Sequence, residues 1–127
     1  MIRLTAYVSG RVQRVGYRAK VVSLANEMGC GFVPIRKFGK LPGSCFSQEC
    51  ELEYGSTTLE IQEGSIHPGQ NVLVVDDVLA TGGTARAADL LVQKLGGVVK
   101  GNAFLIELLV LEGRSRLSAP TYSLMQY

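Results

Sequence analysis

The segment from Val72 to Thr84 constrains the fold more than any other part of the chain. It begins with a continuous apolar run, which is typical of a strand buried on both faces, as the strands of parallel sheets are. Asp76 and Asp77 close this run, and a loop of small residues follows. Beyond the loop, apolar residues recur with the spacing of an amphipathic helix. The segment therefore predicts a strand, a loop and a helix of an α/β protein.

The remainder of the chain also alternates between strand and helix patterns. Polarity alternates over residues 2–8, as in a strand, and an amphipathic helix pattern from Tyr17 ends at Gly29. A hairpin is predicted over 44–62, and further strands are predicted at 31–35, 98–99, 103–111 and 122–125. These elements predict an α/β fold with a mostly parallel sheet flanked by helices, in one domain over residues 1–127.

The first predicted strand carries a polar face. Arg3, Thr5 and Tyr7 alternate with apolar residues along it. A central strand of a parallel sheet would have two apolar faces. We therefore expect the strand over residues 2–8 at an edge of the sheet or partly exposed to solvent.

Composition and charge exclude several functions. A formal net charge of +2 gives no broad basic field for binding nucleic acid. No apolar run approaches the roughly 18 residues of a membrane span, and the first residues lack the apolar block of a secretory signal. Cys30, Cys45 and Cys50 fit no zinc spacing and are expected as free thiols in the cytoplasm. We assign no metal ligands and no role to His67.

The loop after the apolar run has the chemistry of a phosphate site. A helix N-terminus presents unpaired N–H groups, glycines let the backbone approach an anion closely, and threonines supply hydroxyls. The two carboxylates stand where ligands of open α/β sheets bind, and they can accept hydrogen bonds from ribose hydroxyls. A purely structural turn with a threonine cap is the alternative. The residues predicted to bind ribose 5-phosphate are Asp76, Asp77, Ala80, Thr81, Gly82, Gly83 and Thr84.

This segment resembles the signature of type I phosphoribosyltransferases, and residues of about 29–127 resemble adenine phosphoribosyltransferases in particular. Four stretches carry that closer resemblance: Ile35 to Gly43, Leu52 to Gly55, Leu59 to Gln62, and Tyr122 to Tyr127. The resemblance implies an enzyme that converts adenine and phosphoribosyl pyrophosphate into AMP and pyrophosphate. It also implies Mg²⁺ bound with phosphoribosyl pyrophosphate, small-molecule substrates and a homodimer.

The same resemblance implies roles for individual residues. Glu53 lies on a mobile loop that closes over the site and handles the purine proton, with Tyr54 beside it. Arg36, Lys37 and Lys40, from a basic segment predicted as a loop, lie near the pyrophosphate and the purine. Positive groups suit the leaving group, and a closing lid excludes water.

The N-terminal segment of about residues 1–29 resembles a different family. Its stretch from Ala6 to Arg18 is similar to the phosphate loop of acylphosphatases, which implies an anion site with Arg11, Gly16 and Arg18. Arg14 stands where that family usually has glycine, and residues 31–35 contain no asparagine to orient an attacking water. The chain thus resembles a chimera, with an acylphosphatase-like strand, loop and helix before a phosphoribosyltransferase body.

Three functions stay open on the sequence. The first is an adenine phosphoribosyltransferase, truncated or weakly active, because the family's adenine hood and its pyrophosphate loop do not appear among these residues. The second is an acylphosphatase-like phosphohydrolase. The third is a non-catalytic module, such as an engineered scaffold, that binds phosphate or nucleotides.

Overall fold

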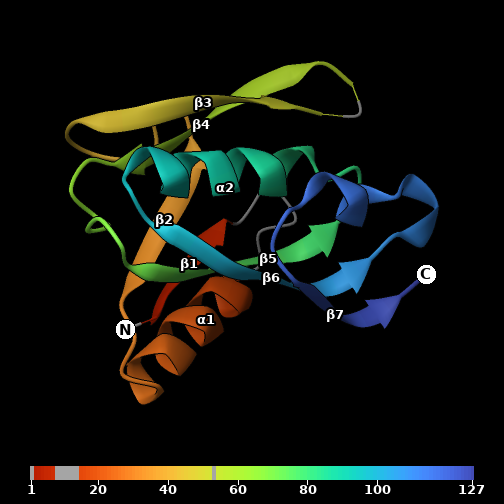
Figure 1. Ribbon diagram of the computed structural model, residues 1–127, viewed down its shortest axis with the longest axis horizontal. Helices are drawn as coiled ribbons and strands as arrows, with labels where there is room; N and C mark the ends of the chain where they lie inside the picture. Colours follow the sequence, from red (N-terminus) through yellow and green to blue (C-terminus); the bar gives the residue numbers. More distant parts are fainter. Residues whose placement is uncertain (1, 8–14, 53) are drawn as a thin grey trace.

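The computed structural model describes residues 2–7, 15–52 and 54–127, whose strands form one seven-stranded sheet (Figure 1). The strand order is β3-β4-β2-β1-β5-β6-β7. The strands are β1 (Ile2–Tyr7), β2 (Phe32–Lys37), β3 (Cys45–Glu51), β4 (Ser56–Gln62), β5 (Asn71–Leu79), β6 (Val98–Glu107) and β7 (Thr121–Gln126). The helices are α1 (Val15–Glu27), α2 (Gly83–Lys94), η2 (Leu109–Leu111) and η3 (Gly113–Arg116).

The predicted α/β fold with a mostly parallel sheet is confirmed. Strands β2, β1, β5, β6 and β7 run parallel to one another, while β4 and β3 are antiparallel additions at one edge. Parallel strands end at the same edge of a sheet, and in open α/β folds ligands bind at that edge. The sheet therefore brings the ends of β1, β2 and β5 together.

The expectation that the first strand lies at a sheet edge was wrong, while the alternative expectation, partial exposure to solvent, concerns side chains outside those that the structure describes. β1 is the middle strand of the seven and pairs in parallel with β2 on one side and β5 on the other. Both of its backbone edges therefore contribute to ladders. The alternation of polar residues along a strand reports on its two faces and does not identify its neighbours, which is why the pattern misplaced it.

Two helices cover opposite faces of the sheet (Figure 1). The larger core lies under α2, where Leu91 and Val92 pack with Val72 and Val74 of β5. A smaller core lies under α1, where Val21 and Ala25 pack against partly buried side chains of β2 and β5. The strand pattern of β5 is thus explained, since its apolar residues face a helix on each side.

Two element boundaries differ from the sequence prediction. Arg36 and Lys37, predicted in a loop, form the end of β2, where they pair with Glu60 and Leu59 of β4. The strand predicted to reach residue 111 ends at Glu107, and residues 109–111 form the 3₁₀ helix η2. The hairpin and the last strand are confirmed as β3–β4 and β7. Within the described ranges, no helix has the length and apolar character to cross a membrane.

Candidate functional site

Asp76 and Asp77 lie near the carboxyl end of β5, almost fully buried. The backbone N–H of Asp77 donates to Oδ1 of Asp76 at 2.8 Å, and that of Val78 donates to Oδ1 of Asp77 at 2.8 Å. Each carboxylate is thereby oriented by the amide that follows it and has a second oxygen for a ligand. The pair can accept hydrogen bonds from two neighbouring hydroxyls.

The electrostatics of this pair favour a cationic or hydrogen-bond-donating ligand. Burial, and then the charge of Asp77, raise the pKa of Asp76 well above the ordinary value of an aspartate. A ligand that brings positive charge beside the pair would favour the ionised form again. Ligand binding and proton release at Asp76 are therefore linked.

The loop between β5 and α2 ends in a helix N-terminus that has no side-chain cap. Gly82 occupies the cap position with a φ of 88°, in the left-handed region that favours glycine. The first helical hydrogen bond runs from the N–H of Arg86 to the Gly82 carbonyl. The backbone N–H groups of the first turn, which come before Arg86, therefore have no acceptor within the helix. Uncapped N–H groups at the positive end of a helix are suited to bind phosphate.

Main-chain atoms from two other segments hold this loop tightly. A Cβ on Gly82 would meet the Gly113 carbonyl oxygen at 2.6 Å, and one on Gly113 would collide with the carbonyl oxygen of Ala80. On the other side, a Cβ on Gly83 would collide with the Glu51 carbonyl oxygen at the end of β3. The candidate phosphate loop, residues 80–84, is thus enclosed between η3 and the β3–β4 hairpin. This arrangement requires glycine at all three positions.

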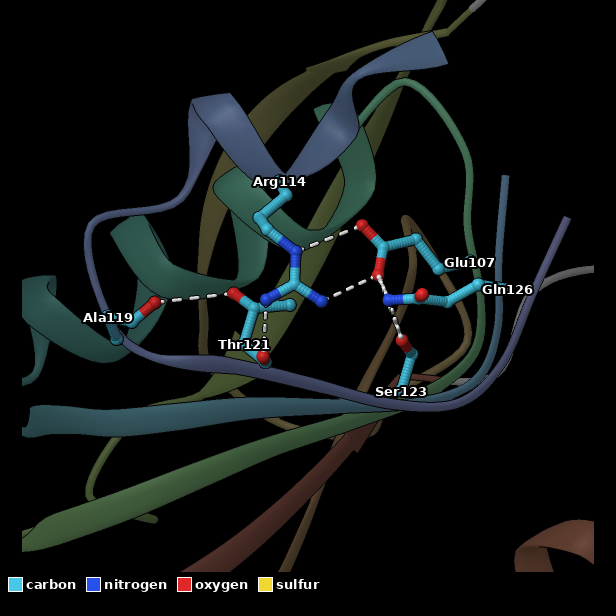
Figure 2. A network of polar contacts seen from close by, with 6 residues as sticks. All are labelled: Glu107, Arg114, Ala119, Thr121, Ser123 and Gln126. Atoms are coloured by element: carbon cyan, nitrogen blue, oxygen red, sulfur yellow. Dashed lines mark hydrogen bonds and ion pairs between the residues drawn. The ribbon is translucent and has the colours of Figure 1, made fainter. Parts of the chain in front are cut away.

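An ion pair between the buried Glu107 and the half-exposed Arg114 fixes the η3 side of the enclosure (Figure 2). Arg114 donates from Nε to Oε2 of Glu107 at 3.1 Å and from Nη2 to Oε1 at 2.6 Å. Ser123 and Gln126 of β7 also donate to Oε1, and Arg114 donates to the Thr121 carbonyl. Because Gly113 precedes Arg114, this network positions the backbone that contacts the phosphate loop.

The basic residues predicted near the pyrophosphate lie at and after the end of β2. The register of β1 with its two neighbours puts Pro34 of β2 level with Val75 of β5, two strand spacings or roughly 10 Å away, and Arg36 and Asp77 each come two residues later. Because successive side chains of a strand lie on opposite faces, Arg36 and Lys37 lie on opposite faces of β2. Lys40 follows in an exposed turn, where the N–H of Gly39 donates to Glu60 at 2.9 Å.

The remaining predicted site residues belong to two other regions. Tyr54 lies in the β3–β4 turn with 89% of its surface exposed, one residue from Glu53, which lies outside the described residues. Arg11 is also outside them. Gly16 and Arg18 lie in α1, near the helix N-terminus.

Comparison with known proteins extends over the whole chain. The adenine phosphoribosyltransferase of Desulfitobacterium hafniense is 53% identical over 105 residues, which is 82% of this chain and 61% of that enzyme. The crystal structure of the enzyme from Thermoanaerobacter pseudethanolicus matches all of this chain and 72% of its own, with a TM-score of 0.87 and 44% identity. The Saccharomyces cerevisiae enzyme, crystallised with adenine and an imino-altritol bisphosphate, matches 98% of this chain and 68% of its own, with a TM-score of 0.86 and 44% identity.

The chain belongs to the adenine phosphoribosyltransferase family. It spans about three fifths of the length of the curated relatives it matches. An acylphosphatase family model also matches residues 4–63, in agreement with the N-terminal resemblance. A chain that is similar to adenine phosphoribosyltransferases in its body thus carries an acylphosphatase-like beginning.

Several residues that shape this phosphoribosyltransferase-like site were missed in the sequence. Glu107 gave a signal, because it is the only charged residue in the apolar run from Ala103 to Leu111. Its partner Arg114 gave none, since six intervening residues conceal the contact. The role of Gly113 also depends on tertiary contacts that no local pattern encodes.

The Glu107–Arg114 pair makes a pH-dependent contribution to stability. The hydrogen bond with Arg114 lowers the pKa of Glu107 from 4.5 to about 2, so this stability is present above pH 4.5 and is lost as the pH falls towards 2. Glu107→Gln should cost about 1–2 kcal/mol at pH 7, and less at pH 3, where part of the pair's contribution is already lost. The range allows for the half-exposed Arg114, whose exposure weakens the pair. Urea denaturation at both pH values measures the difference.

The exposed Glu112→Gln, five residues along the chain, serves as the matched control and should be nearly neutral at both pH values. An equal loss of stability for Glu107→Gln at pH 7 and pH 3 would contradict the assignment of a charged pair.

Proposed function

We propose that this chain binds the ribose 5-phosphate part of phosphoribosyl pyrophosphate and transfers it to adenine, forming AMP and pyrophosphate. The observation that carries the proposal is the buried Asp76–Asp77 pair beside the uncapped, glycine-enclosed N-terminus of α2. Family membership supports the same substrates, since the yeast relative was crystallised with adenine and a bisphosphate. The phosphate loop would hold the 5-phosphate and the carboxylates the ribose hydroxyls.

Charge development explains what these residues contribute to the reaction. Bond formation passes through a cationic ribose while pyrophosphate leaves. The acidic pair, ionised in the presence of that cation, would stabilise it electrostatically. Arg36, Lys37 and Lys40, at and just after the end of β2, would stabilise the departing pyrophosphate.

Mg²⁺ would enter the site as part of the substrate, bound to phosphoribosyl pyrophosphate. Carboxylate oxygens are ligands that Mg²⁺ accepts, and it usually combines one or two of them with substrate phosphates. Asp76 and Asp77 fit that requirement. The described residues contain no group of three or more His, Cys, Asp or Glu arranged to hold a metal ion by themselves.

The turn between β3 and β4 acts as a lid in the same proposal. Glu53, with Tyr54 beside it, would take the purine proton when the hairpin turn closes over the site.

The family resemblance supports a homodimer, and the three free thiols support a cytoplasmic location. We further propose that residues 1–127 fold as one domain, because the acylphosphatase-like β1 is paired on both edges within the common sheet.

A second candidate function is favoured by the acylphosphatase match to residues 4–63. On that resemblance, residues 10–18 with Arg11, Gly16 and Arg18 would bind an anion. β2, the next strand, contains no asparagine to orient water, so anion binding without hydrolysis is the outcome this segment supports. Hydrolysis of benzoyl phosphate distinguishes this candidate from the transferase.

Replacing the acidic pair tests the binding proposal directly. The double variant Asp76→Asn/Asp77→Asn should weaken AMP binding by roughly 10- to 100-fold, because each substitution replaces a carboxyl oxygen that can accept from a ribose hydroxyl with an amide NH2 group, which cannot. Isothermal titration calorimetry measures the affinity. Asp89→Asn is the matched control, since Asp89 is an equally buried aspartate on α2 that pairs with Asn102. Unchanged AMP affinity in a folded double variant would refute the assignment.

The proposed proton acceptor separates turnover from binding. Glu53→Gln keeps the size of the side chain but removes the base, so kcat for AMP formation should fall by at least about 100-fold while AMP affinity changes less than about threefold. Steady-state assays with adenine and Mg²⁺-phosphoribosyl pyrophosphate give kcat. Glu49→Gln, exposed on the same hairpin, should retain full turnover. Equal kcat values for both variants would exclude Glu53 as the base.

A further inference from the structure

The end of β3 touches the phosphate loop at two places. The Cys50 Sγ lies 3.6 Å from the Thr84 Oγ1, a distance and geometry at which either atom can donate a hydrogen bond. The next residue, Glu51, places its carbonyl oxygen where a Cβ of Gly83 would be. The backbone contact fixes the strand against the loop, so the thiol is held beside the hydroxyl. Only 1% of Cys50 is exposed, which keeps water away from the contact.

The direction of this hydrogen bond decides what Thr84 can do. A hydroxyl has one proton to donate and two lone pairs to accept with. If Thr84 gives its proton to the sulfur, it has none for a phosphate oxygen. If the thiol donates instead, the Thr84 proton is free to point at an anion. Burial raises the pKa of Cys50, so the thiol keeps its proton at neutral pH. That proton has two acceptors within reach, Thr84 Oγ1 at 3.6 Å and the Glu51 carbonyl oxygen at 3.8 Å, and the nearer one is Thr84.

We propose that Cys50 is a positioning residue, which donates its S–H to Thr84 Oγ1 and thereby directs the Thr84 hydroxyl proton at the 5-phosphate. The inference rests on the proposed function, because it assumes that a phosphate occupies the loop. It extends that function to the hairpin, because Cys50 lies three residues before Glu53 on the same segment. Phosphate binding at the N-terminus of α2 would then also stabilise the contact between the end of β3 and the phosphate loop.

The experiment compares the affinities of AMP and adenosine, which differ only by the phosphate. Cys50→Val removes the donor and keeps an apolar side chain, slightly larger than that of cysteine, whereas Cys50→Ser keeps a donor. Losing one modest hydrogen bond should weaken AMP binding about 3- to 10-fold in Cys50→Val, with adenosine affinity unchanged and with Cys50→Ser within about twofold of the parent. Cys45→Val, at the opposite end of the same strand, is the matched control and should bind both ligands normally.

A double-mutant cycle isolates the contact. Thr84→Val removes the hydroxyl through which Cys50 acts, so adding Cys50→Val should cause no further loss of AMP affinity. Circular dichroism confirms folding, and Cys50→Ala replaces Cys50→Val if the latter does not fold.

Three results would overturn the inference while leaving the proposed function intact. They are unchanged AMP affinity in Cys50→Val, an equal loss of adenosine affinity, or additive effects in the cycle. Failure of the parent protein to bind AMP at all would overturn the proposed function and this inference with it.

Discussion

Main-chain atoms on both sides of the phosphate loop approach it more closely than any side chain would allow, and the candidate site depends on that contact. Gly113 of η3 lies against Ala80 and Gly82, while Glu51 at the end of β3 lies against Gly83. The Glu107–Arg114 pair fixes η3, and the ladder with β4 fixes β3. Elements remote in sequence thus set the shape of a five-residue loop, which is how the sheet determines the geometry of the site.

Buried negative charge gives the site its chemical preference. Asp76 and Asp77 are buried on β5. Asp89, buried on α2, accepts a hydrogen bond from Asn102 at 3.4 Å. Burial raises the pKa of Asp89 to about 6, so this carboxyl carries a proton in mildly acidic solution. The pair on β5 differs because it lies at the edge where a ligand can supply hydroxyls and cations. The same physical cost that disfavours charge inside a protein therefore favours ligand binding there.

The sequence allowed the fold class, the strand, loop and helix of residues 72–84, and the family to be predicted, because each depends on local patterns. The apolar run and the glycines of residues 72–84 determine a strand, a turn and a helix without reference to the rest of the chain. The central position of β1 could not be predicted, since strand order is set by pairing between distant segments. Arg114 and Cys50 were missed for the same reason, as their partners lie on other elements.

A crystal structure of the protein grown with AMP tests the central claim most directly. The arrangement of α2 and β5 predicts a 5-phosphate on the amides of the first turn of α2, with the Thr84 hydroxyl donating to it. It also predicts the two ribose hydroxyls on Asp76 and Asp77. AMP bound elsewhere, with its phosphate away from residues 80–84, would contradict the assignment of this loop as the phosphoribosyl site.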